Sequence, residues 1–220
     1  MAPKQTIAII GATGKVGSAI ARCLSVGNYR LLLMADESDK LNMLYSTLKQ
    51  PSAIAEIESL NCAKEASWQA DIIIIATPYE GTREVAKRIR EVATGKIVIS
   101  VSQPLDGNAN TTINFSESSS AEELQKLLPH SKVVKTFTPA FALSNFTFLP
   151  DHKMADSFIA GNNGEAVEIV SKLVKQAGFN PVLVGDLSMS RTLERIPSKM
   201  VQETIKTKSN RLASWKIYVF

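Results

Sequence analysis

The stretch IAIIGATGKVG, from Ile7 to Gly17, decides the fold of this chain of 220 residues. Its first four residues form an unbroken apolar run, which is typical of a strand buried on both faces. Three glycines follow at Gly11, Gly14 and Gly17, and residues 14–26 then show helical periodicity with apolar side chains on one face. A strand, a glycine-spaced turn and a helix in this order predict a dinucleotide-binding unit, in which the helix N-terminus faces a pyrophosphate.

The glycine spacing is G-x-x-G-x-x-G, whereas the common dinucleotide fingerprint is G-x-G-x-x-G. A glycine-rich turn without a ligand is therefore an alternative interpretation. The position of the loop between a strong strand and a strong helix favours the binding role.

Strands and helices alternate along the rest of the chain. We expect strands at 29–35, 53–57, 71–78, 95–102, 132–139, 156–161 and 181–186, and helices at 39–49, 62–68, 80–92, 122–129 and 165–178. This alternation predicts an α/β protein with a Rossmann-type doubly wound parallel sheet and a small C-terminal extension. Residues 1–150 would form the dinucleotide-binding domain and residues 151–220 the extension.

Several local signals refine this outline. Ser120 and Glu123 have the spacing of a capping box at the start of a helix, and the polar segment 104–120 before them is typical of a surface loop. Gly178 fits a helix C-cap. Residues 187–220 are expected to be mostly helical with a break at Pro197.

Composition excludes several classes of protein. The chain is 45% hydrophobic and 21% charged, with a net charge of +4 spread along the sequence, so a nucleic-acid-binding patch is not expected. The longest apolar run, DIIIIAT, is too short to cross a bilayer, and the N-terminus lacks a signal peptide. Cys23 and Cys62 are far apart and lack metal-ligand spacing, which indicates buried thiols, no metal site and a cytoplasmic protein.

An acidic residue follows the second expected strand. Asp36 stands where a carboxylate accepts hydrogen bonds from the adenine-ribose hydroxyls and repels the 2′-phosphate of NADP, which favours NAD(H). Lys40 lies one helical turn further on and has the charge to bind a phosphate. A purely structural alternative is that Asp36 and Ser38 cap the next helix.

No catalytic set is evident. His130 and His152 lie in turn-like segments, and Tyr45 with Lys49 matches the Tyr-x-x-x-Lys pair of short-chain dehydrogenases only by coincidence, because it lies on the second helix. Hydride transfer between two bound cofactors needs no protein acid or base. The absence therefore fits a cofactor-to-cofactor reductase, and it fits a non-catalytic dinucleotide sensor equally well.

Five blocks in order, covering residues 6–205, resemble the F420-dependent NADP oxidoreductases and their predicted dinucleotide-binding relatives. The most specific block ends in LSMSRTLE, residues 187–194. The resemblance implies a Rossmann domain, a C-terminal part that closes the nicotinamide pocket, a deazaflavin (F420) or flavin as a second ring, and a homodimer. It implies cofactor binding by Gly11, Thr13, Gly14, Lys15, Val16 and Gly17 at the pyrophosphate, by Ala35, Asp36 and Lys40 at the adenine ribose, by Ala76, Thr77 and Pro78 in the crevice, and by Thr138 and Pro139 near the nicotinamide.

Two departures from the family pattern bear on the cofactor. F420-dependent members carry Ser-Arg where this chain has Ala35-Asp36, and their arginine binds the 2′-phosphate. The block FTPAFA replaces a His-Thr-Ile-Pro-Ala sequence beside the nicotinamide. The aromatic tail, residues 211–220, either covers this pocket or packs in a dimer interface.

Together these patterns predict an NAD(P)-dependent oxidoreductase that transfers a hydride between the nicotinamide and a second acceptor, which is an F420-like deazaflavin, a flavin or a small carbonyl compound. The alternative is a non-catalytic NAD(P)-binding redox sensor. A third possibility is a small-substrate dehydrogenase or imine reductase of similar fold, such as a pyrroline-5-carboxylate reductase, but we do not expect that family's long helical dimerisation domain, because few residues follow Gly185.

Overall fold

A computed structural model describes residues 4–50, 53–102, 117–137 and 154–195. Eight strands form one sheet in the order β3-β2-β1-β4-β5-β6-β7-β8. The strands are β1 (Gln5–Ile10), β2 (Tyr29–Met34), β3 (Glu56–Leu60), β4 (Ile72–Ile75), β5 (Ile97–Ser100), β6 (Lys132–Lys135), β7 (Asp156–Gly161) and β8 (Asn180–Gly185). The helices are α1 (Lys15–Ser25), α2 (Ser38–Leu48), α3 (Ala63–Gln69), α4 (Tyr79–Ile89), α5 (Ser120–Leu127) and α7 (Gly164–Gln176). A 3-10 turn, η1 (Leu187–Met189), follows β8 and leads into helical residues 190–195.

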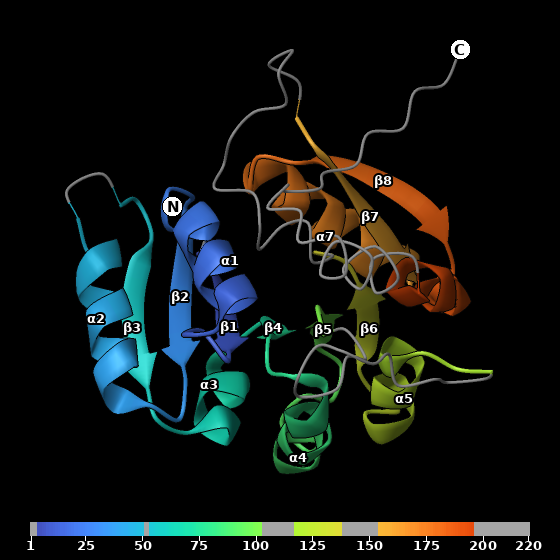
Figure 1. The fold of residues 1–220 in the computed structure, drawn as a ribbon, viewed down its shortest axis with the longest axis horizontal. Coiled ribbons are helices and arrows are strands. Elements are labelled where there is room, and N and C mark those ends of the chain that lie inside the picture. The colour runs from blue at the N-terminus through green and yellow to red at the C-terminus, as the bar shows by residue number, and fades with distance from the viewer. Residues whose placement is uncertain (1–3, 51–52, 103–116, 138–153, 196–220) are drawn as a thin grey trace, which may run out of the picture.

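Helices cover both faces of the sheet, as Figure 1 shows, with α3, α4 and α5 together below it. The strand side chains alternate between two cores: Ile7 and Ile9 pack with α1, α2 and α7, whereas Ala8 and Ile10 pack with α3, α4 and α5. Because the central strands are covered on both faces, they read as continuous apolar runs in the sequence. This arrangement confirms the predicted Rossmann-type α/β fold.

Two strands, β7 and β8, run opposite to the other six, which differs from the expectation of a parallel sheet. β6 and β7 pair antiparallel, with Val134 opposite Gly161, while every other neighbouring pair is parallel. A parallel crossover needs a connection that is usually helical, and the sequence predicts no helix between residues 139 and 156. β7 and β8 nevertheless extend the same sheet as the N-terminal strands. The proposed domain boundary at residue 150 lies outside the described residues.

Two element boundaries are corrected. The third strand spans Glu56–Leu60 and not residues 53–57, because it pairs with β2 from Arg30 opposite Glu56 to Met34 opposite Leu60. The diagonal pair of Arg30 and Glu58 adds an ion pair of 2.8 Å at the sheet edge. The capping box of α5 uses Ser119 and Glu122, one residue before the expected pair. The Ser119 hydroxyl accepts from the Glu122 N–H at 3.2 Å and donates to the Glu122 carboxylate at 2.8 Å.

Candidate functional site

The glycine loop is held between the ends of two strands. The N–H groups of Gly11 and Ala12 both donate to the Met34 carbonyl at the end of β2, at 2.9 and 3.0 Å. Gly11 has a φ of 83°, and a Cβ there would lie 2.8 Å from the carbonyl group of Ala76 after β4. Gly17 has no room for a Cβ either, because it would overlap the Gly11 carbonyl oxygen. These two glycines therefore allow α1 to pack directly against the loop.

The start of α1 is suited to an anion. Its N-cap residue is Gly14, which has no side chain to cap the first turn, and among the described residues no acidic side chain lies in that turn. The first N–H groups of a helix have no intrahelical partner and carry a partial positive charge. A pyrophosphate group fits these donors, and Gly14 brings the backbone close because it has no side chain.

A cleft of about 350 Å³ opens beside this loop. It lies at the carboxyl ends of β1, β2 and β4, where the strand order reverses and α/β proteins bind ligands. Its walls come from the glycine loop, the turn after β2, the turn after β4, the start of α3 and one face of α4. The lining residues are Ile10, Gly11, Thr13, Gly14, Met34, Ala35, Asp36, Glu37, Ala63, Ala76, Thr77, Pro78, Gly81, Glu84, Val85 and Arg88.

The cleft brings together eight of the residues predicted from the sequence: Gly11, Thr13, Gly14, Ala35, Asp36, Ala76, Thr77 and Pro78. Four others lie outside its lining: Lys15 is exposed at the start of α1, Val16 packs on the core, Gly17 is buried, and Lys40 forms an ion pair of 2.7 Å with Glu37. Thr138 and Pro139 lie outside the described residues.

The capping alternative for Asp36 is wrong. Helix α2 begins at Ser38, and its N-cap residue is Glu37, whose side chain makes no capping hydrogen bond within the described part of the chain. Asp36 is exposed and lines the cleft. The Asp36 carboxylate therefore lies at the cleft and does not cap α2.

Comparison with known proteins agrees with this geometry. Residues 6–127 match a family model described as semialdehyde dehydrogenase, NAD binding domain. The chain is also 32% identical over 212 residues to an F420-dependent NADP reductase from Methanocaldococcus jannaschii, an alignment that covers 92% of this chain and 94% of that protein. The chain belongs to the F420-dependent NADP reductase family. It is accordingly an oxidoreductase with a nicotinamide-dinucleotide-binding domain.

A second sequence relative and a solved structure resemble this chain as well. The human metalloreductase STEAP2 is 33% identical over 137 residues, which cover 62% of this chain and 26% of that protein. A crystal structure of a candidate F420-dependent NADP reductase from Arthrobacter sp. FB24 superimposes with a TM-score of 0.76 and 20% identity, over 92% of this chain and 94% of that one. The structural likeness supports the fold.

Other residues singled out in this family member lie away from the cleft. Tyr45 and Lys49 contact each other on α2, where the lysine Nζ donates to the tyrosine hydroxyl at 2.8 Å. His130 is exposed in the turn after α5, and His152 lies outside the described residues.

Cys23 is buried as expected, whereas Cys62 is exposed before α3, contrary to the expectation of two buried thiols. Over the described ranges, no group of side chains is suited to a metal ion, and no helix is long and apolar enough to span a membrane.

A buried ion pair was missed by the sequence reasoning. Lys135 at the end of β6 and Glu194 are 0% and 2% exposed, and their charged groups lie 3.2 Å apart. The Glu194 carboxylate also accepts from the hydroxyl and the N–H of Ser120 at 2.6 and 2.8 Å, and Lys135 donates to the Ser102 carbonyl. These contacts join the ends of β5 and β6, the start of α5 and the last described helix of the reductase. They also explain the shifted capping box, because both donors of Ser120 are engaged by Glu194.

A second contact of the C-terminal signature lies at the same helix start. Two nitrogens of Arg191 bind the two carboxylate oxygens of Glu122 at 2.8 and 2.6 Å. This guanidinium lowers the pKa of Glu122 below its usual range. In sequence, residues 187–194 are a family signature only; in the structure, they hold the start of α5 against the carboxyl ends of β5 and β6.

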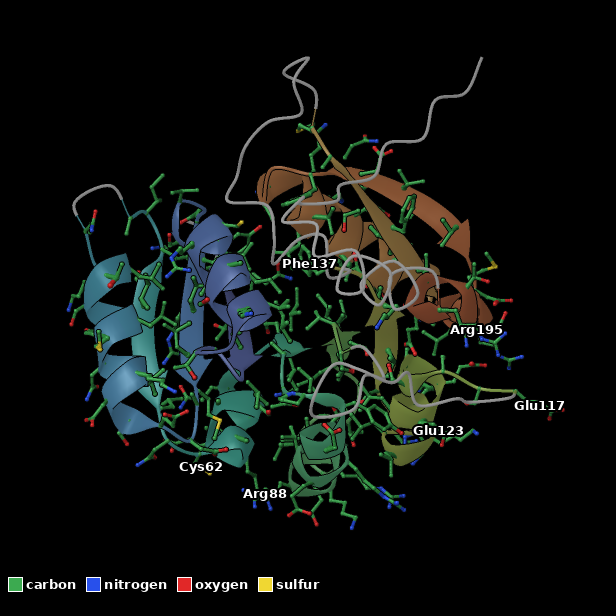
Figure 2. The ribbon with its side chains drawn as sticks, viewed as in Figure 1. Cys62, Arg88, Glu117, Glu123, Phe137 and Arg195 are labelled. Carbon is green, nitrogen blue, oxygen red and sulfur yellow. The ribbon has the colours of Figure 1, made fainter. Side chains whose placement is uncertain are left out.

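The chain after β6 adopts a strained conformation. Phe137 is fully buried and has a φ of 53°, which is rare for a bulky residue (Figure 2). It packs in the core shared with α1 and α7 and directly precedes Thr138 and Pro139. Backbone strain of this kind is concentrated at functional sites.

Proposed function

We propose that this enzyme binds NAD(H) in the cleft and transfers a hydride between its nicotinamide and a second acceptor. The observation that carries the proposal is the cleft itself, in which an uncapped helix start, a tight glycine loop and Asp36 line one crevice. The dinucleotide supplies the hydride chemistry when it is bound. The chain supplies binding and orientation.

Different residues along the cleft bind different parts of the dinucleotide. The first-turn N–H groups of α1 and the Gly14 backbone bind the pyrophosphate. Asp36 accepts hydrogen bonds from the adenine-ribose hydroxyls, and Thr77 with Pro78 lines the path toward the nicotinamide. Thr138 and Pro139 border the nicotinamide, as the family resemblance implies.

NAD(H) is proposed as the preferred dinucleotide because of charge. Among the described residues, the cleft lining carries the carboxylates of Asp36, Glu37 and Glu84 and the guanidinium of Arg88. Lys40 pairs with Glu37 and Arg88 with Glu84, so Asp36 supplies the excess negative charge. A 2′-phosphate would meet this negative excess at short range. The relative from M. jannaschii is named for NADP, so the proposed preference differs from the name of that protein.

An Asp36→Arg variant tests this preference. Loss of the charge-assisted bonds to the ribose weakens NADH binding about tenfold, while NADPH binding improves. Asp39→Arg is the matched control, because Asp39 is exposed in the first turn of α2 and does not line the cleft. The preference is refuted if the wild-type protein binds NADPH more tightly than NADH.

The identity of the acceptor is tested by turnover. Purified protein with NADH or NADPH is offered F420, flavins, a ferric chelate and small carbonyl compounds, and nicotinamide absorbance is followed. A deazaflavin or flavin is the expected acceptor, as the family resemblance implies; among the described residues, the ionisable side chains of the cleft lining lie in the turn after β2 and on α4. Binding of NADH without turnover on any acceptor would favour the redox sensor, and no affinity for either nucleotide would overturn the whole proposal.

The assembly and location belong to the same proposal. We expect a homodimer in the cytoplasm that acts on a small molecule or cofactor and binds no nucleic acid. Sedimentation velocity measures the assembly, and a monomer at micromolar concentration would contradict it.

A further inference from the structure

Helix α4 contributes one complete face to the cleft. Gly81, Glu84, Val85 and Arg88 recur at helical spacing and all line it, with Arg88 furthest from the glycine loop along the helix. Ala63 at the start of α3 lines the cleft as well, and α3 packs against α4. The far end of the cleft therefore has apolar walls from Ala63 and Val85 and one planar cation.

Within the described ranges, the guanidinium of Arg88 makes one weak contact, with Glu84. Its Nε lies 3.1 Å from a carboxylate oxygen of Glu84, and the two side chains are 60% and 59% exposed. An exposed ion pair at this spacing adds little stability. The bond lies in the plane of the guanidinium, so it orients the plane and leaves its faces for another group. In Figure 2, Arg88 lies in the same region of the molecule as Cys62, which immediately precedes α3.

We propose that the guanidinium plane of Arg88 stacks on the adenine base, and that Glu84 positions it. The inference rests on the proposed function, which places the adenine ribose at Asp36; the base beyond that ribose then lies in the part of the cleft that α4 and Arg88 line. An arginine stacks on flat aromatic groups as well as pairing with anions. A 2′-phosphate beside Arg88 would lie in the same cleft as the carboxylates of Asp36 and Glu84, which repel it, so stacking on the uncharged adenine is favoured over pairing with that phosphate.

Three substitutions separate stacking from charge. Arg88→Ala removes both the plane and the charge, Arg88→Lys keeps only the charge, and Arg88→Tyr keeps only a plane. Lys87→Ala is the matched control, because Lys87 is exposed on the same turn of α4 and does not line the cleft. Dissociation constants are measured by calorimetry for NADH, NADPH and reduced nicotinamide mononucleotide, which lacks the adenosine.

Loss of stacking weakens the affinity of Arg88→Ala for NADH and NADPH by the same factor, about tenfold. Arg88→Lys is expected to show a comparable loss, Arg88→Tyr to recover most of the affinity, and the mononucleotide to bind all variants equally. A Glu84→Gln variant is expected to show a smaller loss for both dinucleotides.

Two outcomes would overturn the inference while leaving the proposed function intact. One is wild-type affinity for both dinucleotides in Arg88→Ala. The other is a loss confined to NADPH that Arg88→Lys restores, which would make Arg88 a phosphate ligand. If wild-type protein binds neither dinucleotide, the proposed function fails instead.

Discussion

Gly17 and Gly14 have different duties within the same loop. A methyl group at Gly17 would overlap the Gly11 carbonyl oxygen and lie 3.0 Å from the Ala12 Cα, both of them backbone atoms that cannot turn aside. We therefore expect Gly17→Ala to lower the free energy of unfolding by about 1–3 kcal/mol, the usual cost of overpacking. Urea unfolding measures the change.

Gly14→Ala is the matched substitution. Gly14 is exposed with a φ of −67°, and its nearest neighbour, the Gly11 carbonyl oxygen, would lie 3.4 Å from the new methyl group. The fold should tolerate this change to within about 1 kcal/mol. NADH affinity should fall because the methyl group obstructs the approach of the pyrophosphate. Equal stability of the two variants would contradict the division of duties.

At the scale of elements, the buried pair of Lys135 and Glu194 fixes the start of α5. Glu194→Gln leaves a buried ammonium group without a charge partner, so we expect a loss of about 3–5 kcal/mol in the free energy of unfolding. Lys135→Met alone should also destabilise. The double variant should lose less than the sum of the single variants, with a coupling energy of about 0.5–3 kcal/mol. Additive losses in a double-mutant cycle would show that the two groups do not interact.

The contact between Arg191 and Glu122 predicts a dependence on pH. Because Arg191 lowers the pKa of Glu122 in the folded protein, the contact stabilises the fold above the unfolded pKa of about 4.3 and is lost as pH falls through the folded value. Arg191→Gln should therefore be less stable than wild type at neutral pH, by a modest amount since Arg191 is 42% exposed. The difference should shrink below about pH 4. A difference that is constant down to acid pH would exclude this contact as its cause.

These elements show which parts of the structure the sequence predicts. The first strand, the glycine loop and α1 are predictable because their pattern is local: apolar run, glycines and helical periodicity follow one another within twenty or so residues. The capping box was predicted one residue late because the deciding partner of Ser120 is Glu194, which is distant in sequence. The direction of β7 depends on the connection before it, and no pattern within DSFIAG records that direction.

The cleft is formed by parts of the chain that are distant in sequence, so only its locally encoded residues are predictable. Its glycine loop and Asp36 are adjacent to predictable strands, and both were found from the sequence. Glu84 and Arg88 were not, because they reach the cleft only after α4 has folded across the sheet beside β1 and β4. A charged helix face of this kind is indistinguishable in sequence from an ordinary solvent-exposed face.

The rate at which a thiol reagent labels the buried cysteine measures opening of the fold, and bound dinucleotide should lower that rate. Cys62 is exposed, whereas burial of Cys23 on α1 raises its pKa to about 12. We expect a thiol reagent to label Cys62 in the native protein and Cys23 only when the fold opens. NADH at a hundred times its Kd stabilises the native state by about 2.7 kcal/mol and should slow labelling of Cys23 about a hundredfold when reclosing is fast.

The Asp36→Arg variant is the control for this coupling, because it retains both cysteines and is expected to lose affinity for NADH. Its Cys23 should be protected less by NADH than the wild-type thiol at the same concentration and more by NADPH. Labelling of Cys23 in a Cys62→Ser background gives the rate without interference from the exposed thiol. Equal protection of wild type and Asp36→Arg by NADH would mean that Asp36 does not contribute to NADH binding.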